Sequence, residues 1–83
     1  MTLLYFAWVR QKIGRSEETL ALPDGVKTVA DLIAHLQARG NGYADAFADS
    51  ARLRAAVNQV HAGFETALRE DDEVAFFPPV TGG

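Results

Sequence analysis

The chain has 83 residues, of which 48% are hydrophobic and 23% are charged, so its composition is that of one globular domain and not of a disordered segment. Its net charge of -3 argues against a nucleic-acid-binding protein, which needs a basic face to neutralise phosphates. The chain contains no cysteine, which excludes disulfides, thiolate metal sites and a cysteine nucleophile within it.

Neither a membrane span nor a signal peptide is expected. No apolar run reaches the roughly 18 residues that a helix needs to cross a bilayer. No basic segment precedes the first apolar run, as it would in a signal peptide. These features predict a cytoplasmic protein that contacts neither membrane nor nucleic acid.

The first quarter of the chain predicts a β-hairpin. Residues 3–9 are continuously apolar and rich in aromatic side chains, which predicts a strand with one face on the core and the other available to a partner. Residues 10–15 are polar and contain Gly14, so they are expected to form a turn. Residues 17–22 then form the return strand, which ends in a turn at Pro23-Asp24-Gly25.

The clearest element is a helix that begins at Thr28 and is expected to end at Gly40. Thr28 can accept a hydrogen bond as the N-cap, and Asp31, three residues later, completes a pattern that resembles a capping box. The apolar residues of this segment follow helical spacing and form one stripe: Val29, Leu32, Ile33 and Leu36. A helix with one apolar stripe needs a sheet to lie on.

Four further segments follow the helix. In chain order they are a short helical turn over 43–51, a strand over 53–60, an edge strand over 64–68 and a last strand over 74–77. Gly63 turns the chain before the edge strand, and a charged turn over 69–73 precedes the last strand. That strand ends where Pro78 removes a backbone donor.

This order of elements predicts a single α+β domain over residues 1–77. A mixed sheet of four to five strands around one main helix satisfies the pattern, and the first and last strands are expected to be central neighbours because they are the most apolar. This is the β-grasp, or ubiquitin-like, fold.

Residues 78–83, Pro78-Pro79-Val80-Thr81-Gly82-Gly83, are expected to form a flexible, extended C-terminal tail. Two prolines stiffen its exit, and two glycines lack the Cβ that would block a narrow channel. Fully extended, six residues reach roughly 20 Å. The tail is therefore able to carry a terminal carboxylate into the active site of another protein, although a frayed terminus is the ordinary alternative.

A terminal carboxylate becomes reactive when ATP converts it to an acyl-adenylate. A sulfur donor can then displace AMP and leave a thiocarboxylate, or a lysine amine can displace it and form an isopeptide bond. The sequence contains no glycine-rich phosphate loop, so we expect another protein to bind the ATP and this chain to bind no cofactor and no metal.

The string "DDEVAFFPPVTGG" over residues 71–83 closely resembles the end of the small subunit of molybdopterin synthase, the MoaD family. The strings "YFAWVRQKIG" over 5–14 and "AAVNQ" over 55–59 are similar to the first and middle strands of that family. The resemblance covers the whole chain and implies a β-grasp fold. Two departures are Asp71, where the family has glycine, and Trp8, where it often has a polar residue.

The resemblance also implies a function. An adenylating, E1-like enzyme would activate Gly83 with ATP, and a sulfur donor protein would convert it to a thiocarboxylate, with Gly82 as its channel-fitting neighbour. The tail would enter the large synthase subunit, in a heterotetramer of two small and two large subunits. There it would give sulfur to cyclic pyranopterin monophosphate in molybdenum cofactor biosynthesis, so the chain would be a sulfur-donating subunit and not a catalyst alone.

Partner contacts are expected around the root of the tail. Phe76 and Phe77 point to opposite faces of their strand, so one is expected to fill the core, and the other is either available to a partner or buried under a loop. The resemblance favours Phe77 as the anchor. The predicted partner-binding residues are Phe77, Pro78, Pro79, Val80, Thr81 and Arg10.

Plainer roles compete with some of these assignments. Arg10 is more often part of a solvated turn. The acidic run over 70–73 is expected to be a solvated turn and not a metal site, because consecutive carboxylates do not converge on one ion. His35 and His61 are expected in surface or packing roles, and the sequence leaves the role of Asn58 open.

Three other functions also remain open. The chain could be a thiamine-type sulfur carrier, a ubiquitin-like modifier joined to lysines, or a small binding module whose tail is incidental. Loss of function on removal of the two glycines separates the first two from the third.

Overall fold

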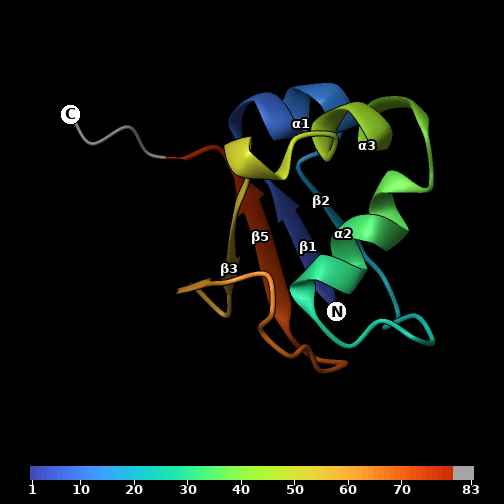
Figure 1. The fold of residues 1–83 in the computed structure, drawn as a ribbon, viewed down its shortest axis with the longest axis vertical. Coiled ribbons are helices and arrows are strands. Elements are labelled where there is room, and N and C mark those ends of the chain that lie inside the picture. The colour runs from blue at the N-terminus through green and yellow to red at the C-terminus, as the bar shows by residue number, and fades with distance from the viewer. Residues whose placement is uncertain (80–83) are drawn as a thin grey trace.

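The computed structural model describes residues 1–79, which form one sheet with helices packed on it (Figure 1). The elements in chain order are β1 (Thr2–Tyr5), α1 (Ala7–Ile13), β2 (Glu17–Thr19), α2 (Val29–Gln37), α3 (Asn41–Ala46), the 3-10 helix η1 (Ser50–Arg52), β3 (Arg54–Val57), β4 (Val60–Ala62) and β5 (Glu73–Phe77). No helix within this part of the chain is long and apolar enough to cross a membrane.

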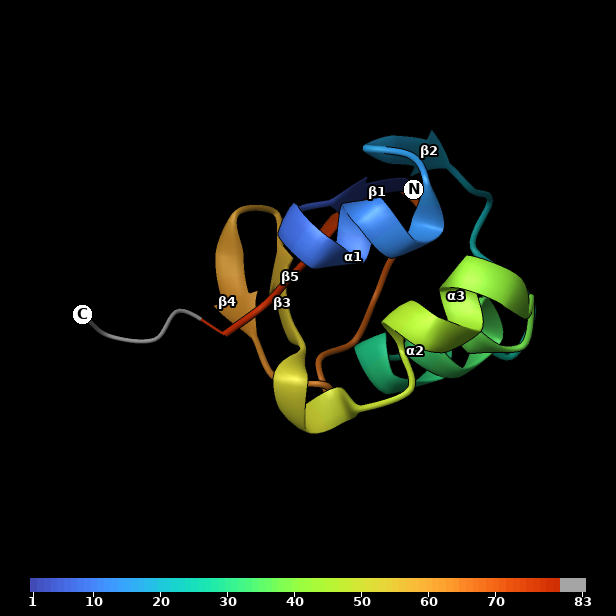
Figure 2. The same ribbon diagram turned by 90° about the horizontal axis from the view of Figure 1, so that it is seen from above.

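Within residues 1–79, five strands form one mixed sheet in the order β2-β1-β5-β3-β4. β1 and β5 pair in parallel, with Leu3 opposite Val74 and Tyr5 opposite Phe76, and the other pairs are antiparallel. The prediction that the first and last strands are central neighbours is therefore confirmed. The helices lie on one side of the sheet (Figure 2), as the predicted β-grasp architecture requires.

The core forms between the sheet and α2. Burial alternates along β1 and β5, so Leu3, Tyr5, Val74 and Phe76 face inward and are almost fully buried. The predicted apolar stripe of α2 is buried against them, which confirms the helical spacing. Phe47 closes the cluster, with its ring 5.0 Å from that of Phe76 in an edge-to-face contact.

The capping box that the sequence predicts at the start of α2 is present. Thr28 Oγ1 accepts a hydrogen bond from the Asp31 backbone N–H at 3.2 Å, and the Asp31 carboxylate accepts one from the Thr28 N–H at 3.2 Å. The predicted end at Gly40 is three residues too late, because the helix ends at Gln37. Gly40, with φ 77°, instead precedes α3 as its N-cap.

The predicted N-terminal hairpin is wrong in its connection. The strand ends at Tyr5 and not at residue 9, α1 replaces the polar turn over 10–15, and β2 is shorter than the predicted 17–22. The helix forms because Val9 and Ile13, four residues apart, both pack on the core. Gly14 ends it with φ 89° and donates its N–H to the Arg10 carbonyl oxygen at 2.8 Å.

The predictions for residues 43–68 are right in outline and wrong in their boundaries. The helical turn over 43–51 is α3 followed by η1. The strand over 53–60 is split, since Asn58 and Gln59 have φ 52° and 69° and form a two-residue turn between β3 and β4. The predicted edge strand over 64–68 is wrong, because only one isolated bridge, Thr28 with Ala67, forms there and β4 takes the edge position.

The acidic turn before β5 is not simply solvated, so that prediction is wrong for Asp72. Its side chain is buried and accepts hydrogen bonds from Asn58 Nδ2 at 2.9 Å and from the Arg69 N–H at 2.8 Å. Asn58 Oδ1 in turn accepts from the Glu73 N–H at 3.0 Å. Asn58 and Asp72 therefore fix the β3–β4 turn against the start of β5, which is the role that the sequence left open.

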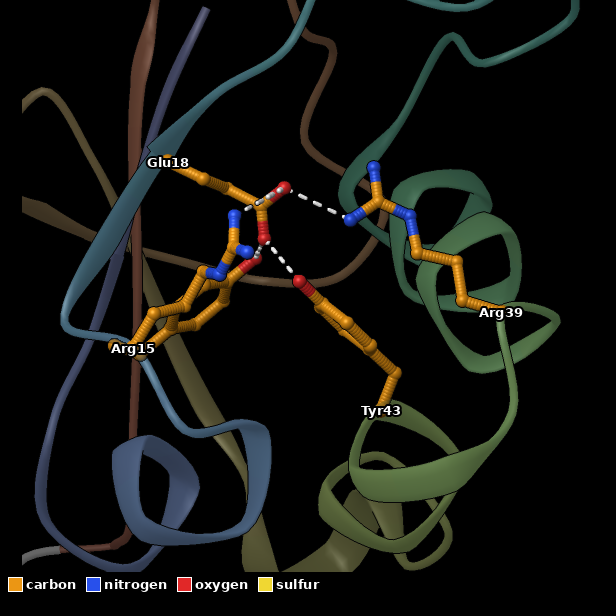
Figure 3. Close-up of polar contacts among 5 residues, drawn as sticks. Arg15, Glu18, Arg39 and Tyr43 are labelled. Carbon is orange, nitrogen blue, oxygen red and sulfur yellow. Dashed lines mark hydrogen bonds and ion pairs between the residues drawn. The ribbon is translucent and has the colours of Figure 1, made fainter.

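A second polar cluster joins β2 to the connection between α2 and α3 (Figure 3). The Glu18 side chain is only 8% exposed and accepts hydrogen bonds from Tyr5 Oη at 2.8 Å, Tyr43 Oη at 2.6 Å and Arg39 Nη1 at 2.8 Å. Arg15 Nη1 lies 4.0 Å away. Burial alone would raise the pKa of Glu18, but the hydrogen bonds from Arg39, Tyr43 and Tyr5 outweigh it and lower that pKa. Burial and the bond to Glu18 raise the pKa of Tyr5.

Candidate functional site

The root of the tail lies at the centre of the sheet. β5, which has β1 and β3 as its neighbours, ends at Phe77, as the following proline predicts. Pro78 and Pro79 are half-buried as the chain leaves the sheet, at the end where α1 and η1 lie (Figure 1). The other predicted tail residues, Val80, Thr81, Gly82 and Gly83, lie outside the described residues.

The last two phenylalanines divide between the faces of the sheet as predicted. Phe76 is fully buried, stacked on Tyr5 with ring centroids 6.3 Å apart. Phe77 is half-buried on the opposite face, where its ring meets that of His61 edge to face at 5.3 Å. Phe77 is therefore positioned as a contact residue beside the tail.

The face that carries Phe77 bears a row of small and apolar side chains that ends at His61, and Arg54 of β3 lies opposite Phe77. The strand registers align Leu4 of β1 with Ala75 of β5, Ala75 with Ala56 of β3, and Ala56 with His61 of β4. We call the surface formed by these four residues and Phe77 the outer face. In Figure 2 the helices lie on the other side of the sheet. Two alanines in the middle of the row keep this surface flat enough for another protein to approach.

Phe6 is a candidate contact residue that the sequence reasoning missed. It is 46% exposed and its N–H donates to the Phe76 carbonyl oxygen at 3.1 Å, so it lies beside the carboxyl end of β5. The next residue, Ala7, has φ 53°, a strained value for alanine that turns the chain from β1 into α1. The alternation that points Leu3 and Tyr5 inward is the signal that would have placed Phe6 outside.

Arg10 lies on α1 and not in a hairpin turn, which corrects its predicted setting. It is exposed, in a shallow depression shared with Gly14, Arg15 and Glu17 at the end of that helix. Trp8, two residues earlier, packs against the core, with the Arg52 guanidinium 5.7 Å from its ring centroid. Arg10 is thus available to a partner, whereas Trp8 is partly committed to the fold.

The described residues offer no ready metal site. Among residues 1–79, no three histidine, aspartate or glutamate side chains cluster in a way that could hold an ion. His35 is half-buried on α2 and His61 is exposed on β4, so the two imidazoles belong to different layers of the molecule.

A comparison with curated proteins finds relatives of the expected kind. The molybdopterin synthase sulfur carrier subunit of Escherichia coli is 43% identical over 81 residues, which cover 98% of this chain and 96% of that protein. The small archaeal modifier protein 3 of Haloferax volcanii is 31% identical over 91 residues, which cover 100% of this chain and 98% of that protein. The resemblance to the MoaD family is thereby confirmed.

The fold and the family follow from two further matches. A solved structure from Pyrococcus furiosus, titled as a molybdopterin converting factor subunit 1, superposes with a TM-score of 0.74, at 32% identity and with 95% of each chain covered. The likeness confirms the predicted β-grasp fold. A model of the ThiS family matches residues 3–83. The chain belongs to the ThiS family.

Proposed function

We propose that this chain is the sulfur-carrying small subunit of a molybdopterin synthase, and that Gly83 carries the sulfur. The observation that supports the proposal best is the position of the tail root. The chain leaves the central strand at Pro78, directly after Phe77 of the outer face and close to Phe6, whose N–H donates to the Phe76 carbonyl oxygen, in a protein that matches sulfur carriers over nearly its whole length. A partner that binds this surface would receive the tail.

The reaction divides between this chain and its partners. An E1-like adenylating enzyme would transfer AMP from ATP to the Gly83 carboxylate and release pyrophosphate. Sulfide supplied by a donor protein would displace AMP and leave the thiocarboxylate. The large subunit would then transfer the sulfur from Gly83 to cyclic pyranopterin monophosphate. Water would supply the oxygen that restores the Gly83 carboxylate. This chain contributes the carrier group and binds neither ATP nor another cofactor, and Gly82 keeps the path to Gly83 narrow.

The test of sulfur loading is the intact mass of the protein. After incubation with the adenylating enzyme, ATP and a sulfur source, we expect a gain in mass equal to the exchange of one oxygen for sulfur, located on the C-terminal peptide. A reaction without ATP is the control. The same adenylating enzyme has to load a known sulfur carrier in a parallel reaction. If it does so and the mass of this chain stays unchanged, the proposal is refuted.

The partner surface consists of the outer face, Phe6 and Arg10, and its occupant is the large subunit of the synthase. The outer face is apolar and ends at Phe77, so it continues directly into the tail that the large subunit would bind. Exposed aromatic side chains such as Phe6, next to apolar residues, are typical of the core of a protein interface. An exposed arginine such as Arg10 is typical of its rim. Two such complexes would associate through the large subunits to give the two-plus-two assembly.

Replacement of Phe77 by aspartate is expected to weaken binding to the large subunit at least tenfold, because it places a charge at the centre of an apolar contact. Phe77 is only half-buried and outside the core, so the melting temperature should fall by no more than a few degrees. Titration calorimetry measures the affinity. Ala30→Asp, which adds the same charge at an exposed position of α2 on the other side of the sheet, is the matched control and should bind normally. Equal affinity of the Phe77→Asp variant and the unmodified chain would contradict this assignment.

The similarity to the archaeal modifier protein favours a second candidate function, conjugation to lysine amines. Both functions begin with adenylation of the same carboxylate. Adducts of higher mass that contain this chain in cell lysates would favour conjugation, whereas a free thiocarboxylate favours the carrier.

A further inference from the structure

We infer that His61 makes the docking of the outer face depend on pH, because the partner accepts its imidazole only in the neutral form. The inference rests on the proposed function, since it concerns the same surface and the same large-subunit partner.

His61 ends a row of otherwise small and apolar side chains, and the cation nearest to that row is Arg54, which lies opposite Phe77 in the strand register. It pairs with Ala56 across the β3–β4 ladder, and its ring contacts Phe77 edge to face at 5.3 Å with an interplanar angle of 75°. Leu4 and Ala75 complete the row on the neighbouring strands. A partner that covers Phe77 therefore covers the imidazole as well.

The charged groups on the neighbouring elements do not neutralise His61. On β3, Arg54 lies opposite Phe77 but is a cation, which cannot neutralise an imidazolium, and its Nη1 donates to the carbonyl oxygens of Ala51 and Leu53 at 3.2 Å and 2.9 Å. On β5, Glu73 lies at the opposite end of the strand from Phe77. Glu65, after β4, has its carboxylate beside Gly63. Within residues 1–79, no carboxylate lies within ion-pair distance of the His61 imidazole.

The sign of the effect follows from desolvation. Burial of an imidazolium against apolar groups without a counter-charge is unfavourable, so binding favours loss of the proton. Histidine is the side chain that ordinarily changes charge between about pH 5 and 8. Acidification protonates the free protein and leaves less of the form that binds. If only the neutral imidazole binds, the apparent affinity falls by about tenfold at a pH one unit below the pKa of the free histidine, because only about a tenth of the protein then carries the neutral form.

The experiment compares the pH dependence of affinity between variants. The full chain is titrated with the purified large subunit from the same organism, by calorimetry, at several pH values between about 5.5 and 8. His61→Leu and His61→Gln remove the titrating group, one with an apolar and one with a polar side chain. His35→Gln removes the other histidine, which lies on α2 and away from the outer face. The comparison cancels any titration of the large subunit itself.

For the unmodified chain and for His35→Gln, we expect the Kd to rise on acidification by up to about tenfold more than for either His61 variant. An equal pH dependence in all four proteins, or tighter binding of the unmodified chain in acid, would overturn the inference and leave the proposed function standing. Absence of binding at every pH, with all proteins folded by circular dichroism, would overturn both.

Discussion

Deletion of Gly83 will abolish sulfur transfer and leave the folded domain unchanged. The truncated chain still ends in a carboxylate, but that carboxylate retreats by about 3.5 Å, the length of one extended residue. A displacement of this size removes the reacting atom from a preorganised active site. Among residues 1–79, the last member of the core is Phe76 and the pairing of β5 ends at Phe77, so the core of this part of the chain does not depend on Gly83.

Two measurements test this prediction. Molybdopterin formation with the large subunit should fall to background, and the free energy of unfolding in urea should change by less than about 0.5 kcal/mol. Gly83→Ala is the matched control, since it keeps the chain length and the carboxylate and adds only a methyl group. A partial loss in that variant would show the part played by the width of the channel. Full activity of the truncated protein would refute the carrier function.

Replacement of Glu18 by alanine will destabilise the domain by about 2 to 4 kcal/mol, because it orphans three groups that hydrogen bond to a largely buried carboxylate. Tyr5 and Tyr43 lose their acceptor, and Arg39 loses its ion pair. β2 is only three residues long and depends on this cluster for its attachment to the α2–α3 connection. For a domain of this size the melting temperature should fall by about 10 to 25 °C.

The neighbouring residue provides the control. Glu17 is exposed, so Glu17→Ala should change the stability by less than about 0.5 kcal/mol. Calorimetry or urea unfolding measures both variants. A Glu18→Ala protein as stable as the Glu17→Ala protein would show that the cluster contributes little.

The pH dependence of stability gives an independent check on Glu18. Its folded-state pKa is lowered below the ordinary value of 4.5, so the unfolded chain binds the proton first as the pH falls. The contribution of Glu18 should therefore be complete above about pH 5 and disappear as the pH falls through 4.5 toward the folded-state pKa. Glu18→Gln should flatten the stability curve in that window relative to the unmodified protein. The pKa of Asp31 is also lowered, mainly by the hydrogen bond from the Lys27 backbone N–H. Asp31 is present in both proteins, so its contribution is the same in both stability curves.

Local signals in the sequence were sufficient for the start and the apolar stripe of α2 and for the end of β5. The capping box needs only Thr28 and Asp31, which are three residues apart, and the apolar stripe of α2 repeats within nine residues. β5 is recognisable from its short apolar run and from Pro78, which follows the last residue of the strand. The tail motif and the β-grasp fold follow from the order of these elements and from the resemblance over the last thirteen residues.

The run over residues 3–9 shows where local signals fail. A short, continuously apolar segment fits a strand and a buried helix equally well, because both of its faces look the same. Its first half pairs with β5, and its second half becomes α1, where Gly42 of α3 approaches so closely that a Cβ there would overlap the Lys12 carbonyl oxygen. The packing of α1 on α3 and of Val9 and Ile13 on the core places Trp8 and Arg10 on a helix and leaves Phe6 exposed next to the end of β5.

The sequence by itself determined the class of fold, the main helix, the last strand and the glycine that is proposed to carry sulfur, because each depends on residues close together in the chain. Tertiary structure alone decided the rest. Glu18 meets Tyr5, Arg39 and Tyr43 across as many as 25 residues of chain. His61 meets Phe77 only because the strand order β5-β3-β4 brings them to one face. Such contacts depend on strand register, because a shift of one residue would move Tyr5, Glu18, His61 or Phe77 to the opposite face of the sheet.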